Sequence, residues 1–453
     1  MINKTIEITP LLDTKKPILC KMSDGLRKYL GLSKQLHSLE IACGMHTVLC
    51  PIVFINKEED FSLALTKQTF DELHLPLKPY TLQGKLVNQK QLQLGPIIGL
   101  LADIKQTDSE VSLGSIEYFC EELATFCETK GIFFYIFSLS TYHNEQLKGF
   151  YFHQQEWHEA IVPYPNVVHN RIHSRKAEHS KKFLEVTSDF IKKKIPYFND
   201  RFLNKWEVHQ ILSKSEHLMP YIPEAQLLES KSNLENMLKD KKDLFIKPIN
   251  GSQGRRIFRV MEMNDQTYHL DFTTFSGDIK KDYDSYQQLF SVLYPRLKKE
   301  GFLLQETIKL KKYQNRTLDF RFLCHKKDGH TWKVTSAVAR VSNANQFVAN
   351  LARGGELYSL KTLLNELYSN KESRHLRKLL AELSLEIVNM ICLRAGGEFG
   401  EFGIDLALDE DGHPWIIEVN TKPSKSNDSQ KSKIRPSARA VINYCLFLSK
   451  FKE

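Results

Sequence analysis

Short apolar runs separated by polar loops occupy the first part of the chain and predict a small β-rich domain over residues 1–95. Its strand candidates combine β-branched or aromatic content with turn residues at their ends. They are Pro17–Met22, Ser38–Ala42, Thr47–Phe54, Tyr80–Val87 and Gln91–Leu94. Nothing in this segment indicates what the domain does.

The next hundred residues alternate strand, helix and strand. Ile97–Leu101 and Ile132–Leu139 are continuous apolar runs of the kind found in buried strands, and Ile116–Thr129 between them repeats apolar residues at helical spacing. This βαβ pattern predicts an α/β domain over residues 96–195. A third region, residues 196–453, contains the motifs that indicate chemistry.

Two apolar runs flank Asp411-Gly412 in the segment Gly403–Asn420, which predicts a β-hairpin. If these two residues form the turn, Asp405 lies opposite Glu418, and Asn420 shares a face with Glu418. Directly opposed like charges are destabilising, so the three oxygen-bearing side chains indicate a hard cation such as Mg²⁺ between them. A solvated hairpin with scattered acids is the alternative interpretation.

A glycine-containing loop upstream offers a partner for such a cation. In the segment LFIKPINGSQGRR, a short apolar strand ends at Lys247. A loop with Gly251, Ser252 and Gly254 follows it. Glycines let backbone N–H groups approach an anion, and a lysine adds a point charge suited to phosphate. The spacing is not that of a P-loop, and taken alone the segment is also typical of an ordinary hairpin with a basic rim.

The segment FLLQETI provides candidate groups for adenine. Gln305 and Glu306 follow an apolar lead-in, and Ile308 comes two residues later. A carboxylate with adjacent backbone groups suits the exocyclic amine and ring nitrogen of adenine, with Ile308 near the ring. An edge strand with a solvent-facing Glu306 is the alternative.

Further polar side chains stand on or after predicted strands of the third region. Asp319 and Arg321 alternate with phenylalanines and therefore share one strand face, and Arg340 ends the strand that follows. The run NLARGGE then carries Asn350 and Arg353.

The middle region contains the run VVHNRIHSRK. His169 and His173 would converge on a metal only in a helix, whereas the flanking residues favour a strand and a loop, so we do not expect a metal there. Asn170 and Arg171 at the strand end are candidates to contact an acidic substrate, because ligands bind beyond the carboxyl ends of parallel strands.

Composition narrows the class of protein. The 453 residues are 42% hydrophobic and 26% charged, which is ordinary for a globular chain of two to three domains. No apolar run approaches the length of a membrane span, no secretory signal is visible, and the eight cysteines include no Cys-x-x-Cys. We therefore expect a cytoplasmic protein with reduced core thiols. The formal net charge of +9 is spread over many segments, so no specific nucleic-acid signal emerges.

The motifs occur in one order along the chain: Lys205, Lys247 with its glycine loop, Gln305-Glu306, Asp319-Phe320-Arg321, Asn350 with Arg353-Gly354-Gly355, and Asp405 followed by Glu418-Val419-Asn420. This order resembles ATP-grasp enzymes, on the side of glutathione synthetase and RimK. Over nearly its whole length the chain is similar to the YheC/YheD family, endospore coat-associated proteins of spore-forming bacteria. One departure is Val348, which stands where many RimK-like members carry a basic residue.

The resemblance implies an α/β and α+β multidomain fold: an N-terminal β-rich domain, a Rossmann-like pre-ATP-grasp domain and a C-terminal ATP-grasp domain. It implies ATP and Mg²⁺ as cofactors, with Mn²⁺ a substitute. Phosphates would be held by Lys205, Lys247, Gly251, Ser252 and Gly254. The alternative for Lys205 is an ordinary lysine at the start of a helix. Gln305, Glu306, Ile308, Asp319 and Arg321 would complete the nucleotide site, with Asp319 near the ribose. Metal ligands would be Asp405, Glu418 and Asn420, and catalytic residues Arg340, Arg353 and Asn350.

The implied activity is a carboxylate–amine ligase that works through an acyl phosphate on a small-molecule or peptide carboxylate. The implied location is the cytoplasm, with incorporation in or on the spore coat and coat proteins as partners. Two other classes fit the same residues: a coat-associated ATP-binding protein without ligase turnover, and a phosphotransferase. A new amide or ester product would separate the ligase from both.

Overall fold

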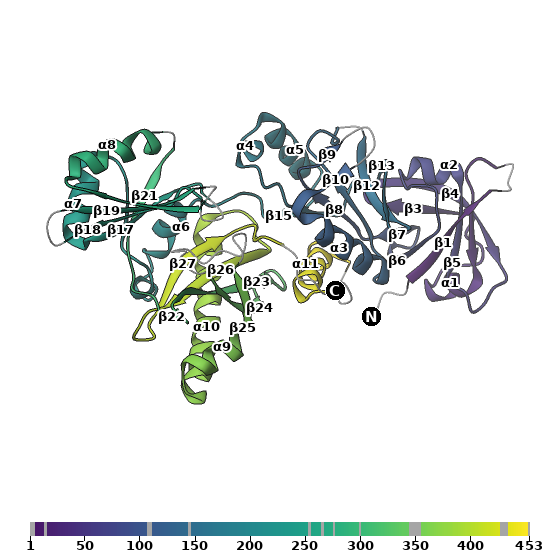
Figure 1. The fold of residues 1–453 in the computed structure, drawn as a ribbon. Helices are drawn as coiled ribbons and strands as arrows, with labels where there is room; N and C mark the ends of the chain where they lie inside the picture. The colour runs from purple at the N-terminus through teal and green to yellow at the C-terminus, as the bar shows by residue number, and fades with distance from the viewer. Residues whose placement is uncertain are drawn as a thin grey trace.

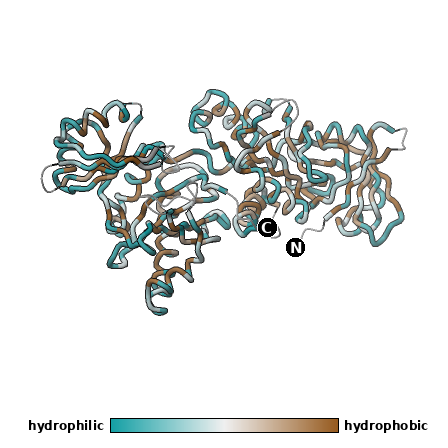
Figure 2. Tube along the Cα trace, in the orientation of Figure 1, coloured by the Kyte–Doolittle hydropathy of each residue, from teal (hydrophilic) through white to brown (hydrophobic). Residues whose placement is uncertain are grey.

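The computed structural model describes residues 5–12, 16–106, 111–143, 146–251, 255–263, 267–274, 277–298, 300–343, 355–425 and 434–451. Its sheets follow one another along an extended arrangement, with the N-terminal strands at one end and the lobe of β17–β21 at the other (Figure 1). Hydrophobic residues are concentrated along the strands and in parts of the helices (Figure 2).

The N-terminal strands form a closed barrel in the order β1-β5-β2-β4-β3-β7-β6. All five predicted strands are present, and the structure adds β1 and β5, which the sequence pattern did not predict. The strands are β1 (Thr5–Leu11), β2 (Cys20–Ser23), β3 (Ser38–Cys43), β4 (His46–Ile55), β5 (Ser62–Thr66), β6 (Tyr80–Asn88) and β7 (Gln91–Gly95). Two short helices accompany them, α1 (Asp24–Tyr29) and α2 (Lys67–Glu72).

The middle region contains a six-stranded sheet in the order β13-β12-β11-β8-β14-β15. Strands β11, β8, β14 and β15 run parallel, so their carboxyl ends meet at one edge. The strands are β8 (Ile97–Leu101), β11 (Phe133–Phe137), β12 (Leu147–His153), β13 (Glu156–Val162), β14 (Val167–Asn170) and β15 (Tyr197–Phe198). The predicted strand–helix–strand order is confirmed, with helix α3 (Glu117–Thr129) between β8 and β11.

Smaller elements complete this region: β9 (Lys105–Gln106), β10 (Val111–Ser112), η1 (Gly114–Ile116), α4 (Arg175–Glu178) and α5 (Lys181–Lys192). The C-terminal helix α11 (Pro436–Leu448) packs against α3 and shares its hydrophobic core through Ala438, Val441 and Cys445. It also packs against strands of the last sheet, β23 and β24. The end of the chain therefore joins two regions that we separated at residue 195, and the three domain boundaries stay predictions.

Two further six-stranded sheets carry the sequence motifs. The first has the order β16-β21-β17-β18-β19-β20, covered by α7 (Lys231–Lys241) and α8 (Tyr286–Leu297). Its strands are β16 (Ala225–Leu227), β17 (Asp243–Pro248), β18 (Phe258–Glu262), β19 (Tyr268–Thr274), β20 (Gly277–Tyr283) and β21 (Phe302–Glu306).

The second has the order β25-β24-β23-β26-β27, with β22 paired to β23. Its strands are β22 (Lys312–Tyr313), β23 (Arg316–Lys326), β24 (Trp332–Val341), β25 (Glu356–Ser359), β26 (Glu401–Leu408) and β27 (Pro414–Asn420). Its helices are α6 (Lys205–Leu212), η2 (Met219–Tyr221), α9 (Leu360–Leu367) and α10 (Asn370–Ala395). Helix α10 ends at Gly396, whose positive φ of 66° favours glycine.

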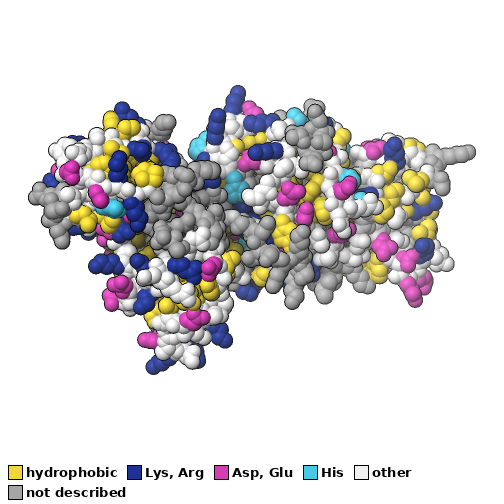
Figure 3. All heavy atoms as spheres, viewed as in Figure 1, with side chains coloured by type: hydrophobic (Ala, Val, Ile, Leu, Met, Phe, Trp, Pro, Cys, Tyr) yellow, Lys and Arg dark blue, Asp and Glu magenta, His cyan; other side chains and the backbone are white. Residues whose placement is uncertain are grey.

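The surface and the thiols agree with the composition. On the face shown in Figure 3, Lys and Arg side chains are spread over several elements among Asp and Glu. All eight cysteines are free, and seven are buried. Within the part of the chain that the structure describes, no helix is long and apolar enough to cross a bilayer.

Candidate functional site

The hairpin of β26 and β27 places Asp405 opposite Glu418, as predicted, but by a different route. The predicted two-residue turn at Asp411-Gly412 is wrong. The loop runs from Asp409 to His413, closed by backbone hydrogen bonds of 3.0 and 3.1 Å. A bulge between Asp405 and Leu406 then shifts the register by one residue and restores the predicted pair.

Two arginines from neighbouring strands hold the Asp405 carboxylate, which is only 3% exposed. Arg321 lies opposite it on β23 and donates through Nη2 to Oδ2 at 2.7 Å and through Nε to Oδ1. Arg340 on β24 reaches the same carboxylate, with Nη2 at 3.0 Å from Oδ2. Antiparallel pairing of β23 with both β24 and β26 brings the three side chains to one face.

Asp319 also belongs to this cluster. Arg340 donates to its two carboxylate oxygens at 2.6 Å each, and Asp319 is 6% exposed. Burial raises the pKa of Asp319 to about 6, although Arg340 opposes that shift. The predicted role of Asp319 near the ribose stays a prediction.

Glu418 contacts a lysine from another part of the chain. Lys205 is the first residue of α6. Asn204 caps this helix, and its side chain accepts from the backbone N–H of Glu207. The Nζ of Lys205 lies 2.5 Å from Glu418 Oε1 and 3.0 Å from the carbonyl oxygen of Gly251. The predicted phosphate loop and the predicted metal hairpin therefore meet at one ammonium group.

Lys247 lies nearby at the end of β17. Its Nζ donates to Gln305 Oε1 on β21 at 2.5 Å. Burial lowers the pKa of Lys247 to about 8, and Lys205 adds to this shift while Glu418 opposes it. Gly251 follows, and a Cβ there would stand 2.4 Å from Pro248 Cγ, so the tight turn after Lys247 requires glycine.

The candidate adenine residues sit at the end of β21. Glu306 Oε1 accepts from the backbone N–H of Glu224 at 2.7 Å, and Glu306 donates its own N–H to Glu224 O at 3.0 Å. Ile308 is half-buried just beyond the strand. Their role toward adenine stays a prediction. Ser252, Gly254, Asn350 and Arg353, as well as Val348, lie outside the described residues.

The residues present fit a divalent cation with a polyphosphate. Asp405 and Glu418 offer carboxylate oxygens across the hairpin, and the buried Nδ2 of Asn420 has no hydrogen-bond partner. Four cations, Lys205, Lys247, Arg321 and Arg340, stand against three carboxylates, Asp319, Asp405 and Glu418, which leaves a positive charge for phosphate. Among the residues that the structure describes, no three His, Cys, Asp or Glu side chains form a metal-binding cluster.

Sequence reasoning missed a second polar cluster on the same strand. Glu401 is fully buried and lies near five donors from distant segments. Its Oε1 accepts from Arg171 at 2.9 Å, Asn199 at 3.1 Å and His169 at 3.2 Å, and its Oε2 pairs with Lys425 and lies 3.5 Å from His325. The sequence gives no local signal for it, since Arg171 and Glu401 are 230 positions apart.

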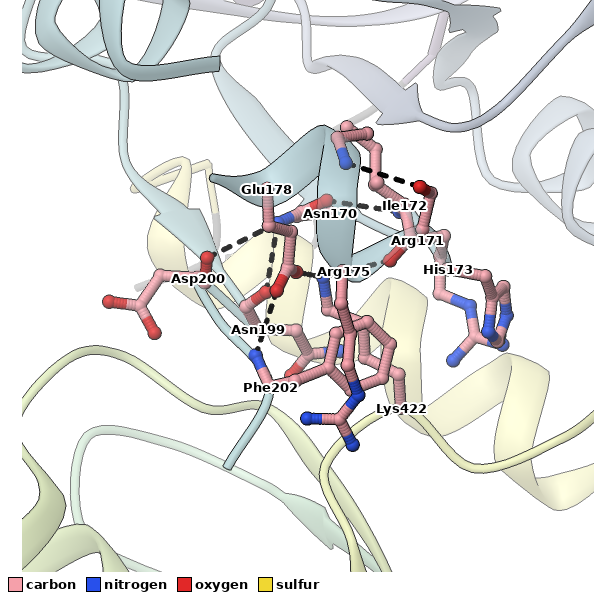
Figure 4. Close-up of polar contacts among 12 residues, drawn as sticks. Asn170, Arg171, Ile172, His173, Arg175, Glu178, Asn199, Asp200, Phe202 and Lys422 are labelled. Atoms are coloured by element: carbon pink, nitrogen blue, oxygen red, sulfur yellow. Dashed lines mark hydrogen bonds and ion pairs between the residues drawn. The ribbon is translucent and has the colours of Figure 1, made fainter. Parts of the chain in front are cut away.

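Figure 4 shows the polar contacts around the strand-end run of the middle region. Asn170 and Arg171 are fully buried and bind protein groups, so neither is placed to contact an acidic substrate as we predicted. His169 lies in β14, and His173 lies in the loop that follows it. The predicted strand and loop are therefore confirmed. The two imidazoles contact different partners, Glu401 and Arg171.

Comparison with known proteins identifies the motif-bearing region. Residues 194–448 match a family described as YheC/D like ATP-grasp. The chain is 27% identical over 400 residues to "Endospore coat-associated protein YheD" of Bacillus subtilis (strain 168), covering 87% of this chain and 86% of that protein. It is 23% identical over 277 residues to "Endospore coat-associated protein YheC" of the same strain, covering 60% of this chain and 74% of that protein.

Solved structures are also similar. The D-alanyl-alanine synthetase A of Vibrio cholerae O1 biovar eltor str. N16961 is 13% identical, with a TM-score of 0.47 over 79% of this chain and 99% of that chain. The ATP-grasp ligase PsnB, complexed with its minimal precursor, is 11% identical, with a TM-score of 0.42 over 77% of this chain and 98% of that chain.

Proposed function

Because the chain belongs to the YheC/D-like ATP-grasp family, we propose that it is an ATP- and Mg²⁺-dependent carboxylate–amine ligase. The observation that carries this proposal is the meeting of two sheets at Lys205. One sheet supplies the phosphate loop at Gly251, and the other supplies the facing carboxylates Asp405 and Glu418. The ammonium group of Lys205, suited to phosphate, is thus hydrogen-bonded to Glu418, a candidate metal ligand.

The residues divide between nucleotide and metal. Lys205 and Lys247, with the loop of Gly251, Ser252 and Gly254, would hold the phosphates. Gln305 accepts from Lys247 and would orient it, while Glu306 and Ile308 would select adenine. Asp405, Glu418 and Asn420 would hold Mg²⁺, or Mn²⁺ in its place, and the ion would neutralise charge that develops on the transferred phosphoryl group.

The remaining residues would shape the charge around the reacting carboxylate. A substrate carboxylate oxygen would attack the terminal phosphorus of ATP, and ADP would leave. The acyl phosphate would then lose phosphate as an amine attacks its carbonyl carbon and releases a proton. Arg340, with Arg353 and Asn350, would stabilise the transferred group, and Asp319 would hold Arg340 in place. This chemistry needs no side-chain nucleophile.

The names of the relatives, endospore coat-associated proteins, support a role at the spore coat. We expect synthesis in the cytoplasm before incorporation. A small-molecule or peptide carboxylate is the expected substrate, and coat proteins are expected partners. The two alternatives, an ATP-binding coat protein without turnover and a phosphotransferase, rest on the same site.

The test is ADP release by the full chain with Mg²⁺, ATP and a panel of amino acids and short acidic peptides, with mass analysis of the products. A ligase gives ADP, phosphate and a new amide in equal amounts, whereas a phosphotransferase gives ADP and a stable phosphorylated acceptor. Glu418→Gln should lower turnover by orders of magnitude. Glu410→Gln, an exposed carboxylate in the same hairpin loop, is the matched control and should not change turnover. Absence of any acceptor-dependent ADP would favour the ATP-binding protein without turnover.

A further inference from the structure

Two arginines leave the carboxyl end of β14, and their surroundings differ. Arg171 is fully buried and its guanidinium binds Glu401, the carbonyl oxygen of Pro423 and His173. Arg175, at the start of α4, is partly exposed. Within the described ranges it forms no ion pair, because its one side-chain hydrogen bond goes to the neutral Asn250 Oδ1 at 3.1 Å.

The loop that carries Arg175 is fixed at the sheet edge. Asp103, two residues beyond β8, accepts from the backbone N–H groups of His173 at 3.0 Å and Ser174 at 3.2 Å. Ser174 in turn caps α4 by accepting from Ala177 N at 3.1 Å. The Arg175 guanidinium lies over the ring of Phe202, 4.8 Å from its centroid (Figure 4). Its position is therefore held without a carboxylate.

The two carboxylates near Arg175, Glu178 and Glu418, already bind other groups of the protein. Glu178 accepts from Lys422 Nζ with one oxygen and from the backbone N–H of Phe202, at 3.0 Å, with the other. Glu418 pairs with Lys205. Both carboxylates act on Arg175 electrostatically, opposing the lowering of its pKa by burial, but neither binds it. A cation held in place with unused donors is a site for an anion from outside the chain.

The location of Arg175 indicates which kind of anion it binds. It stands between the carboxyl ends of β8 and β14, where parallel sheets bind ligands, and Asn250, the residue before Gly251 of the phosphate loop. A substrate carboxylate that approaches the triphosphate meets like-charge repulsion, which a guanidinium fork offsets by pairing with both carboxylate oxygens.

We propose that Arg175 binds the carboxylate that this protein activates. The inference rests on the proposed ligase function and adds the first recognition contact for its carboxylate substrate. It also replaces Arg171, our sequence-based candidate, with the arginine four residues later. The substrate class is a carboxylic acid whose charge, rather than its hydrogen-bonding shape alone, is required.

The experiment measures the melting temperature of the full chain loaded with Mg²⁺ and a non-hydrolysable ATP analogue. The added probes are acids paired with their own amides: acetate and acetamide, succinate and succinamide, N-acetyl-L-glutamate and N-acetyl-L-glutamine. We expect at least one acid to raise the melting temperature of the parent chain when its amide does not. In Arg175→Gln the apparent affinity for that acid should fall about tenfold or more, and Arg175→Lys should recover part of it.

Lys176→Gln is the matched control, because it removes one positive charge from the next position of α4, at an exposed side chain. It should leave the acid-dependent shift in place. All variants should keep the shift produced by Mg²⁺ and the nucleotide analogue. An Arg175→Gln chain that responds to the acid as the parent does would overturn the proposal, and so would a parent chain that distinguishes no acid from its amide. Failure of the proposed function would look different: the parent would then release no acceptor-dependent ADP with a new amide, or would show no nucleotide shift at all.

Discussion

Strand β26 carries two carboxylates on one face, Glu401 and Asp405, and they have opposite surroundings. Glu401 is enclosed by Arg171, Lys425, Asn199 and two histidines, all within the protein. Asp405 is also buried and ion-paired, but its neighbour across the hairpin, Glu418, has a side chain that is 28% exposed, and Lys205 is 20% exposed.

The difference separates a structural joint between segments, at Glu401, from the candidate reaction site at Asp405. Donors to Glu401 come from the middle region, from β23 and from the segment after β27, so its charge ties those segments together. The Asp405 cluster opens through Glu418 and Lys205 toward the phosphate loop. Buried charge alone therefore does not distinguish the candidate site on this strand, and the partly exposed edge of the Asp405 cluster does.

The largest expected effect is on stability at the closed cluster. Glu401→Gln leaves Arg171 and Lys425 buried without a negative partner, which should cost about 3–5 kcal/mol of unfolding free energy. Denaturant unfolding followed by circular dichroism measures it. Glu58→Gln is the control, because that carboxylate pairs with Lys28 and both side chains are more than half exposed, so its loss should cost far less. Equal costs for the two variants would remove the distinction between joint and surface pair.

Acid should weaken the same cluster. Burial lowers the pKa of His169 to about 4, although Glu401 opposes the shift. Between about pH 6.5, the usual histidine value, and pH 4 the unfolded chain binds this proton and the folded chain does not. Stability should therefore fall as the pH drops through this window, by about 3 kcal/mol from His169.

The variant His169→Gln keeps a donor for Glu401 and removes the titration, so its stability should depend less on pH between 6.5 and 4. The exposed His217, paired with Glu386 at the surface, provides the control His217→Gln. Chemical unfolding at several pH values compares the three chains. If the His169→Gln chain loses stability as steeply as the parent, the buried neutral imidazole is not a source of acid sensitivity.

These features differ in how well they could be predicted from the sequence. The facing of Asp405 and Glu418 follows from alternation and turn residues inside one hairpin, although a bulge rather than the predicted turn sets the register. The arginines on Asp405 depend on the order of strands β24, β23 and β26, which no local pattern specifies. For the same reason neither the pairing of Asp319 with Arg340 nor the packing of α11 on α3 was foreseen.

Arg321 should compete with a divalent cation for the Asp405 carboxylate, because both need the same oxygen lone pairs. Without nucleotide, Arg321→Gln should therefore bind Mn²⁺ several-fold more tightly than the parent, as measured by electron paramagnetic resonance of free Mn²⁺. Arg316→Gln on the same strand, where Arg316 pairs with Glu356, should bind like the parent. Weaker Mn²⁺ binding by Arg321→Gln would show instead that the arginine supports the metal ligands.

The smallest expected effect is on the fold at Glu418. Its ion pair with Lys205 is partly exposed, so Glu418→Gln should cost about 1 kcal/mol of unfolding free energy or less in the absence of ligand. With Mg²⁺ and an ATP analogue the parent should gain melting temperature through ligand linkage, and the variant should gain much less. A variant that is strongly destabilised without ligand would make Glu418 a structural residue like Glu401.

The central claim is that the hairpin carboxylates bind a divalent cation together with ATP. Calorimetric titration of the full chain with a non-hydrolysable ATP analogue, once with Mg²⁺ and once with chelator, tests it most directly. We predict binding at least tenfold tighter with Mg²⁺, since Asp405 and Glu418 would otherwise face the phosphates without a cation between them. Equal affinity in the two titrations would contradict the assignment of this hairpin as a metal–nucleotide site.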